Sequence, residues 1–168
     1  AIESGRIKLD CEDYDLCGLI RDVIEEFLLI TKKENKEIVY HSLAENCRVY
    51  GDPARIRQVV VNLISNAVKY TNDNGVVEVT LKNQENDVVF IVADNGPGIE
   101  PEEQEKIFEP YHRAKLKKTK KEGTGLGLPI VKEILELHGG KITLEESTMQ
   151  GSVFLCLIPR RCYVGSKN

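Results

Sequence analysis

Apolar residues recur along the chain with two different spacings. Between residues 15 and 33 they fall three or four positions apart, which is typical of an amphipathic helix with one buried face. Several shorter segments alternate apolar and polar residues, which is typical of strands. These patterns predict helices over residues 15–33, 53–70, 101–108 and 126–137, and strands over residues 37–42, 48–50, 76–82, 87–93, 141–145 and 152–158.

Capping and turn residues set the limits of these elements. Asp52-Pro53 predicts a helix start, because Asp accepts a bond from a free backbone N–H and Pro has no N–H to satisfy there. Residues 72–75, Asn-Asp-Asn-Gly, supply a turn, Gly139-Gly140 closes the last helix, and residues 111–123 are predicted to form a long irregular loop. The elements together predict an α+β fold, a two-layer sandwich with a mixed, mostly antiparallel sheet covered on one face by three helices.

The composition indicates one globular domain. The chain has 168 residues, of which 41% are hydrophobic, enough for a single buried core. No run of about 18 apolar residues occurs, and residues 1–9 lack the pattern of a signal peptide, so a soluble chain is expected. The formal net charge of −4 argues against a general nucleic-acid binder. A local exception is the dense basic run of Arg113, Lys115, Lys117, Lys118, Lys120 and Lys121.

The cysteines form no recognisable motif. Five are present, an odd count without CxxC spacing. This pattern argues against a zinc site and against a disulfide framework, and it suits a reducing cytosol. Ordinary thiols are therefore expected at Cys11, Cys17, Cys47, Cys156 and Cys162.

One side of the helix predicted from residue 53 carries polar residues that suit nucleotide chemistry. At about 100° per residue, Asn62, Asn66 and Lys69 fall on the same face. A carboxamide oxygen is a suitable ligand for Mg²⁺, and an ammonium group neutralises phosphate charge. On periodicity alone, a solvated helix face is the preferred interpretation, because these residues need only water.

Two glycine-rich segments add further candidates. Residues 94–99, Asp-Asn-Gly-Pro-Gly-Ile, end a predicted strand, where glycine lets a ligand lie close and Asp can accept a bond from an exocyclic amine. A turn that begins with Asp is the commoner explanation. Residues 123–128, Gly-Thr-Gly-Leu-Gly-Leu, lead into a helix whose first N–H groups suit a phosphate. The second segment fits neither a P-loop nor a Rossmann fingerprint, because its spacing differs from the first and it follows a lysine-rich loop rather than a strand.

The order of these segments resembles the catalytic, ATP-binding domain of sensor histidine kinases. Residues 62–71 resemble the N box, 94–99 the G1 box, 107–111 the F box, 123–128 the G2 box, and 151–154 the last glycine element of that family. The match spans nearly the whole chain, and four boxes in the correct order are a specific signal. Residues 2–7 also resemble the end of the dimerisation helix that precedes such a domain. The resemblance thus implies a preceding helix end and linker over residues 1–10, the catalytic domain over 11–160 and a tail over 161–168.

The resemblance also implies the Bergerat ATP-binding fold of the GHKL superfamily, with ATP and Mg²⁺ as ligands. Asp94 would accept the adenine amino group and Asn66 would coordinate Mg²⁺. Asn62 would support the metal and phosphate end, Lys69 would approach the phosphates, and Arg113 would reach the γ-phosphate. The implied catalytic residues are Asn62, Lys69 and Arg113, and the implied cofactor-binding residues are Asn66, Tyr70, Asp94, Gly96, Gly98, Ile99, Gly123, Thr124, Gly125, Leu126, Gly127, Leu128 and Ser152.

The implied function is transfer of the ATP γ-phosphate to a histidine on a separate dimerisation domain. None of His41, His112 and His138 lies in the His-Glu helical context of the family, so the acceptor is expected outside this chain. The implied partners are ATP and ADP, the protein's own dimerisation and histidine-phosphotransfer domain, and a response-regulator receiver domain, with a homodimeric parent and no nucleic acid. The expected location is the cytoplasm, and membrane anchoring of the parent is left open.

Three alternatives from the same superfamily are less well supported by the sequence. The first is a GHKL-type ATPase that drives conformational change, as in the gyrase and Hsp90 relatives. Those families use a glutamate on the N-box helix to activate water, whereas the corresponding turn here carries Asn62, which disfavours efficient hydrolysis. A binding-only pseudokinase is disfavoured by the intact Asn66 and Asp94, and a serine or protein kinase by the opening segment.

Overall fold

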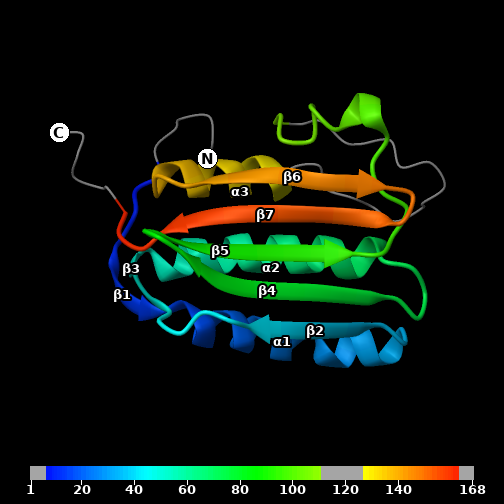
Figure 1. Ribbon diagram of the computed structural model, residues 1–168, viewed down its shortest axis with the longest axis horizontal. Coiled ribbons are helices and arrows are strands. Elements are labelled where there is room, and N and C mark those ends of the chain that lie inside the picture. Colours follow the sequence, from blue (N-terminus) through cyan, green and yellow to red (C-terminus); the bar gives the residue numbers. More distant parts are fainter. Residues whose placement is uncertain (1–6, 111–126, 163–168) are drawn as a thin grey trace.

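The chain folds into two layers, a mixed sheet and a set of helices on one of its faces (Figure 1). The computed structural model describes residues 7–110 and 127–162. In these residues the helices are α1 (Leu16–Lys33), α2 (Pro53–Tyr70) and α3 (Gly127–Leu137), and the strands are β1 (Glu12–Asp15), β2 (Glu37–Ser42), β3 (Arg48–Gly51), β4 (Val76–Gln84), β5 (Asp87–Asp94), β6 (Lys141–Thr148) and β7 (Gly151–Pro159). The main sheet has the order β2-β4-β5-β7-β6, and β1 pairs with β3 in a separate small sheet. The predicted α+β sandwich is confirmed.

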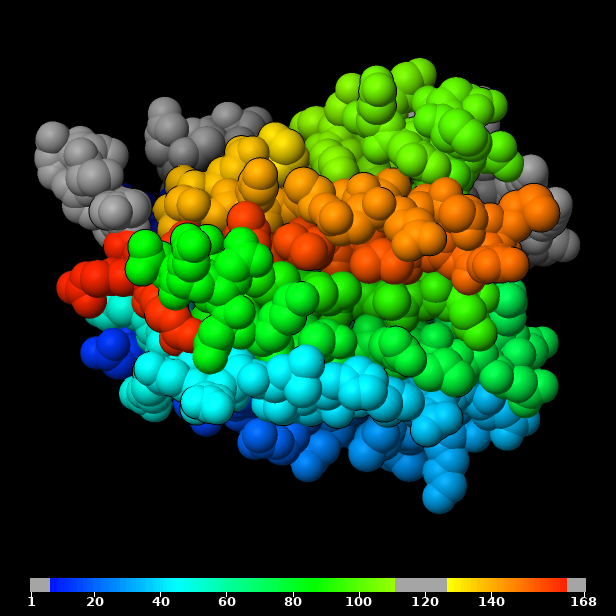
Figure 2. Space-filling model, in the orientation of Figure 1, coloured from blue at the N-terminus to red at the C-terminus, as the bar shows by residue number. Residues whose placement is uncertain are grey.

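The main sheet is mixed, as predicted. β2 pairs with β4 in parallel, and the other neighbouring strands are antiparallel. A parallel pair needs a long crossover, which here contains β3 and α2. On the face away from the helices, Ile91 of β5 lies opposite Leu155 of β7, and the pair is flanked by Thr80 of β4 and Thr143 of β6. Figure 2 shows this face, on which the strands lie side by side.

The core lies between the helices and the other face of the sheet. Ile56, Val60 and Ile64 of α2 are fully buried, as is Phe90 of β5, the largest of the fully buried side chains. Burying each such side chain stabilises the fold by about 1.5–3 kcal/mol. These residues form the buried apolar face of α2. None of the helices in the described ranges is both long and apolar enough to cross a lipid bilayer.

α2 begins as its sequence predicts. Asp52 has extended backbone angles, and its carboxylate accepts a hydrogen bond from the N–H of Arg55 at 3.2 Å. Pro53 occupies the first helical position, where no backbone donor is needed. The start of the helix that carries the candidate site is therefore fixed by local chemistry.

Two predictions of secondary structure were wrong. The helix predicted over residues 101–108 is only a short 3₁₀ segment, Pro101–Glu103, followed by turns. A segment of this length forms too few hydrogen bonds to offset the cost of starting an α-helix, and the burial of Ile107 is achieved without one. β1 was missed altogether, because its four residues are mostly exposed and show no clear alternation.

The expectation that all five cysteines are ordinary thiols was also wrong. Cys17 and Cys47 form a disulfide that joins the start of α1 to the segment before β3. The two residues are 30 positions apart, so no local spacing signals the pair. They meet because the N–H of Leu16 donates to the carbonyl oxygen of Cys47 at 2.9 Å. Within the described residues, Cys11, Cys156 and Cys162 are free.

His138 joins the C-terminal end of α3 to the start of α2. Its Nδ1–H donates to the carbonyl oxygen of Ile134 at 2.9 Å, and its Nε2 accepts from the backbone N–H of Asp52 at 3.0 Å. The carboxylate of Asp52 also accepts from the N–H of Asp10 at 2.8 Å. Three parts of the chain therefore meet at Asp52, namely the start of α2, the end of α3 and the segment that precedes β1. The His138 side chain is fully buried, and this burial lowers the pKa of the imidazole below its usual value.

Replacing His138 by Ala should lower the free energy of unfolding by about 2–4 kcal/mol, because it opens a cavity and leaves the Asp52 N–H without an acceptor. Urea unfolding followed by circular dichroism measures this loss. The matched control is His41→Ala, which changes an exposed histidine of β2 and should alter stability by less than about 0.5 kcal/mol.

The same residue predicts a pH dependence. Because the folded protein holds His138 with a lowered pKa, the unfolded chain binds the proton more readily. Stability should be fully present above about pH 6.5 and should fall as the pH drops below that value towards the lower folded-state pKa. The free energy of unfolding is measured against pH for wild type and His138→Ala, from pH 7 down to the onset of carboxylate titration. Equal slopes for the two proteins would contradict the lowered pKa of His138.

Candidate nucleotide site

α2 carries three predicted site residues along one side. Asn62, Asn66 and Lys69 are half-buried, whereas the apolar residues between them are buried in the core. The side-chain Nδ2 of Asn62 donates to the carbonyl oxygen of Gly127 at 3.3 Å, which ties α2 to the first residue of α3. The Nζ of Lys69 lies 5.9 Å from the centroid of the Tyr70 ring at the end of the helix. The polar side of α2 therefore faces the start of α3 and is not simply a solvated surface.

Asp94 is the last residue of β5 and lies between β4 and β7. Its Cα is paired with Val77 on one side and Ser152 on the other. The carboxylate accepts from the backbone N–H of Gly96 at 2.8 Å and from that of Ser152. Burial raises the pKa of this carboxyl above its usual value, and the two N–H donors only partly oppose that effect. A carboxylate has lone pairs for about four donors, so it can still accept a bond from a ligand.

The turn after Asp94 packs against the neighbouring backbone so closely that only glycine fits. A Cβ on Gly96 would lie 2.1 Å from the carbonyl oxygen of Tyr70 at the end of α2. A Cβ on Gly98 would lie 2.1 Å from the carbonyl oxygen of Thr148 at the end of β6, and Gly98 has a positive φ of 83°. These glycines therefore place the turn between α2 and the β6–β7 hairpin.

Sequence reasoning assigned no role to Thr71 and Asn95, which join the end of α2 to this turn. The Thr71 hydroxyl donates to the Asn95 side-chain oxygen, which also accepts from the N–H of Val76 at 3.3 Å. Asn72 donates from its side chain to the carbonyl oxygen of Asn95 at 2.6 Å. Both residues lie in the segments singled out from the sequence, but their pairing across 24 positions has no local signal.

Ile99 is held at the other end of the turn. Its N–H donates to the hydroxyl of Ser147 at 2.8 Å, and that hydroxyl is 2.9 Å from the hydroxyl of Ser152. The side-chain amide of Gln104 donates to the carbonyl oxygen of Ile99 at 2.9 Å. Ser152 was a predicted site residue, and it links the Asp94 carboxylate to this network.

Three contacts bring predicted site residues from different elements together. Asn62 of α2 contacts the start of α3, and Tyr70 at the end of α2 contacts the turn at Gly96. Asp94 at the end of β5 contacts Ser152 of β7. Residues of α2, α3, β5 and β7 are therefore linked to one another. Leu128 is half-buried in the first turn of α3. Five predicted residues lie outside the described part of the chain, namely Arg113, Gly123, Thr124, Gly125 and Leu126.

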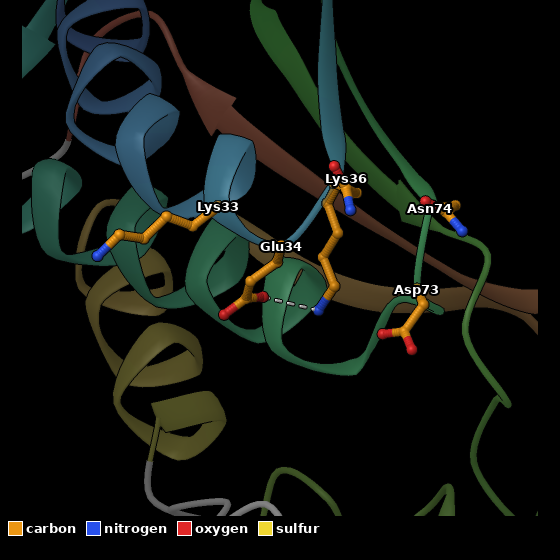
Figure 3. A pocket seen from close by; sticks show the side chains of 6 residues that line it. Lys33, Glu34, Lys36, Asp73 and Asn74 are labelled. Atoms are coloured by element: carbon orange, nitrogen blue, oxygen red, sulfur yellow. Dashed lines mark ion pairs between the residues drawn. The ribbon is translucent and has the colours of Figure 1, made fainter.

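A polar pocket of about 420 Å³ lies beside the C-terminal end of α1 (Figure 3). None of the site residues within the described ranges lines it; its lining residues are Lys33, Glu34, Asn35, Lys36, Asp73 and Asn74. The buried Nζ of Lys36 pairs with Glu34 at 3.0 Å and donates to the carbonyl oxygen of Val68 at 2.8 Å. A cation at the C-terminal end of a helix satisfies free carbonyls and stabilises the helix dipole. Lys36 therefore fixes the last turn of α2, which carries Lys69 and Tyr70.

Comparison with protein families identifies one match over most of the chain. Residues 51–161 match the family described as histidine kinase-, DNA gyrase B-, and HSP90-like ATPase. The sensor histidine kinase RppB from Synechocystis sp. (strain ATCC 27184 / PCC 6803 / Kazusa) is 35% identical over 152 residues, which cover 88% of this chain and 34% of RppB. The chain therefore spans about a third of the length of that relative.

Solved structures give the same family. The nucleotide-free catalytic domain of histidine kinase ThkA is 37% identical, with a TM-score of 0.81 over 90% of this chain and 97% of that domain. A structure of ThkA in complex with the response regulator protein TrrA has a TM-score of 0.76 at 34% identity, over 90% of this chain and 42% of that one. Full-length ShkA in complex with AMPPNP has a TM-score of 0.81 at 30% identity, over 94% of this chain and 32% of ShkA.

Replacing Gly96 by Ala should lower the free energy of unfolding by about 1–3 kcal/mol, because the new methyl group collides with the Tyr70 carbonyl and forces the backbone to shift. Urea unfolding measures the loss, and calorimetry should show weaker nucleotide binding in the same variant. Gly18→Ala in α1 is the matched control, since the nearest atom to its Cβ, the Oδ2 of Asp15, would lie at 3.1 Å and would need to shift only slightly. Equal stability of the Gly96 and Gly18 variants would rule out the close contact.

Proposed function

The chain belongs to the family of histidine kinase-, DNA gyrase B-, and HSP90-like ATPases and is the catalytic, ATP-binding domain of a histidine kinase, and from this we propose that it binds Mg-ATP between α2, the Asp94 turn and the start of α3 and donates the γ-phosphate to a histidine of a separate dimerisation domain. The observation that carries the proposal is the buried carboxylate of Asp94. Its two backbone donors orient it at the end of β5, beside the turn that contacts α2.

We assign Asp94 to adenine recognition. The exocyclic amine of adenine is a donor, and a carboxylate fixed by two N–H groups is a pre-oriented acceptor for it. A ring carrying a carbonyl oxygen at the same position would place an acceptor against an acceptor and would bind more weakly. Ile99 and the glycines at 96 and 98 would shape the pocket around the base, because the turn that contains them is held at both ends.

We assign the polar side of α2 to the phosphate end of the nucleotide. The amide oxygen of Asn66 is a hard ligand of the kind that Mg²⁺ accepts, and Asn66 lies one helical turn beyond the Asn62 amide that contacts α3. When bound, Mg²⁺ would neutralise charge on the phosphate oxygens. Lys69 would add a positive charge on the same side, and Gly127 and Leu128 begin the helix whose first N–H groups would face the phosphates. We assign the same phosphate role to residues 123–126 and the γ-phosphate to Arg113.

Phosphoryl transfer requires an acceptor, and the histidines of this chain are poor candidates. Both ring nitrogens of His138 are engaged in hydrogen bonds within the core. His41 lies on β2 rather than on a helix, and His112 lies outside the described residues. We therefore assign the acceptor histidine to a separate dimerisation domain, which residues 1–10 would join to this one. A response-regulator receiver domain would then take the phosphate, as the ThkA complex with TrrA suggests for a related chain. We expect this chemistry in the cytoplasm, where ATP is available.

The alternative, an ATPase that drives conformational change, is less well supported. Such an enzyme needs a general base to activate water, and the carboxamide of Asn62 cannot take up a proton at neutral pH. The Asn62 amide is also engaged with the Gly127 carbonyl. An amide at position 62, in place of a base that could activate water, favours transfer of the phosphate to another protein.

Replacing Asp94 by Asn should weaken ATP binding about 10- to 100-fold, because it removes a charged acceptor. Calorimetry with ATP and with inosine triphosphate, which carries a carbonyl at the amine position, should show that the preference for ATP falls as well. The folded variant should be at least as stable as wild type at pH 7, since the raised pKa of Asp94 means that its ionised form costs stability above that pKa. Glu78→Gln, an exposed carboxylate-to-amide change on β4, is the matched control. Unchanged ATP affinity in the Asp94 variant would overturn the adenine assignment.

The kinase activity itself is tested by phosphotransfer in trans. The purified chain, γ-labelled ATP and Mg²⁺ are mixed with a dimerisation hairpin of a sensor histidine kinase. We expect acid-labile, base-stable label on the hairpin, as for a phosphorus–nitrogen bond, and far less with Asp94→Asn. Intact ATP binding without label on any such hairpin would refute the kinase function. Steady phosphate release by the chain alone would favour the ATPase alternative instead.

A further inference from the structure

Two pairs of cysteines lie at the opposite ends of the small β1–β3 sheet. At one end Asp15 pairs with Arg48, next to the Cys17–Cys47 disulfide. At the other end Glu12 pairs with Gly51, and Cys11 immediately precedes this pair. The Sγ atom of Cys11 lies 2.9 Å from the Sγ atom of Cys162. Four of the five cysteines thus occur as two close pairs, although the second pair is separated by 151 positions.

The backbones of the second pair are held in place independently of the two sulfurs. Before Cys11, the N–H of Asp10 donates to the Asp52 carboxylate at 2.8 Å. At Cys162, the N–H donates to the carbonyl oxygen of Tyr50 in β3 at 3.0 Å. Arg161 forms an isolated bridge with Tyr50, and its guanidinium lies 4.4 Å from the centroid of that ring. The two thiols are therefore brought together by the fold itself.

We propose that Cys11 and Cys162 form a second, reversible disulfide that ties the segment before β1 to the segment after β7. A disulfide requires sulfurs about 2.0 Å apart, so these atoms need to approach by only about 1 Å. Redox conditions would decide the state of the pair, which stays open where thiols are kept reduced and closes where they are oxidised. The crosslink would form whether or not the chain binds ATP.

Closure can proceed by exchange with glutathione disulfide. The Cys11 thiol, the more exposed of the two, loses its proton and attacks one sulfur of glutathione disulfide, which releases one glutathione and leaves a mixed disulfide. The Cys162 thiol then loses its proton and attacks the Cys11 sulfur, which releases the second glutathione. Two protein thiols are oxidised and one glutathione disulfide is reduced to two glutathione molecules.

The surroundings of Cys11 indicate slow exchange. Burial, with Cys162, Asp52 and Asp10 beside the thiol, raises the pKa of Cys11 to about 12. Little thiolate is then present at neutral pH, and thiolate is the attacking form.

The crosslink lies at the opposite end of the sheet from Asp94. β7 runs seven residues from Ser152, opposite Asp94, to Pro159, opposite Asp87, which is roughly 23 Å at about 3.3 Å per residue. Sites this far apart usually behave independently, so nucleotide affinity should change by less than about twofold. Linking two ends of the domain should instead raise its melting temperature by about 5–15 °C.

The test is to equilibrate the full chain in glutathione buffers from reducing to oxidising, block free thiols with N-ethylmaleimide, digest it and identify linked peptides by mass spectrometry. We expect a Cys11–Cys162 peptide in oxidising buffer, its loss on adding dithiothreitol, and the rise in melting temperature only when it is present. Cys11→Ser and Cys162→Ser should each lose this peptide and the rise while retaining the Cys17–Cys47 peptide.

The wild-type chain alone can overturn the proposal, so it does not depend on either variant folding. If Cys11 and Cys162 are still recovered as alkylated free thiols from a buffer in which Cys17 and Cys47 are fully linked, the pair does not close. Linkage of Cys11 or Cys162 to any other cysteine instead of to each other would contradict it equally.

Discussion

The contact on which the site depends is the one between the turn after β5 and the main chain around it. Gly96 lies against the carbonyl at the end of α2, and Gly98 lies against the carbonyl at the end of β6, with no room for a side-chain carbon at either position. This contact brings the Gly96 N–H to the Asp94 carboxylate. It also lets Asn95 bond to Thr71, so the turn and the last turn of α2 hold each other in place. Polar groups from a helix and a strand end thereby acquire fixed relative positions.

The site is electrostatically costly, and the rest of the fold compensates. Asp94 is a carboxylate whose neutral form is favoured by burial, and two backbone N–H donors, those of Gly96 and Ser152, oppose this by favouring the charged form. The opposing stability comes from the apolar face of α2 against the sheet and from buried polar contacts such as that of Lys36 with the end of α2. A functional group that destabilises the empty domain is a common feature of binding sites, because selection acts on the ligand-bound state as well.

The sequence predicted most of the fold because its signals are local. Asp52 and Pro53 mark the start of α2 within two residues, and alternation marks the long strands. Short elements such as β1 lack enough residues for a pattern, and the Cys17–Cys47 pair depends on a contact across 30 positions. The same distinction holds for the site. Its segments were identified from their composition and order, whereas the bond from Asn62 to Gly127 spans 65 positions and can be known only from the folded chain.

β3 has a neighbour that is synthesised very late. Tyr50 accepts from the N–H of Cys162 and donates to the carbonyl of Arg160, both more than 100 residues further along the sequence. At about 5–20 residues per second, a ribosome needs roughly 5–20 s to add the intervening residues. During that time this edge of β3 is without its final partner, and the pairing is completed only once residues 160–162 have been synthesised. The domain therefore reaches its native state only after residues 160–162 have left the exit tunnel, so nascent chains that stop before these residues would expose an unpaired strand edge to chaperones.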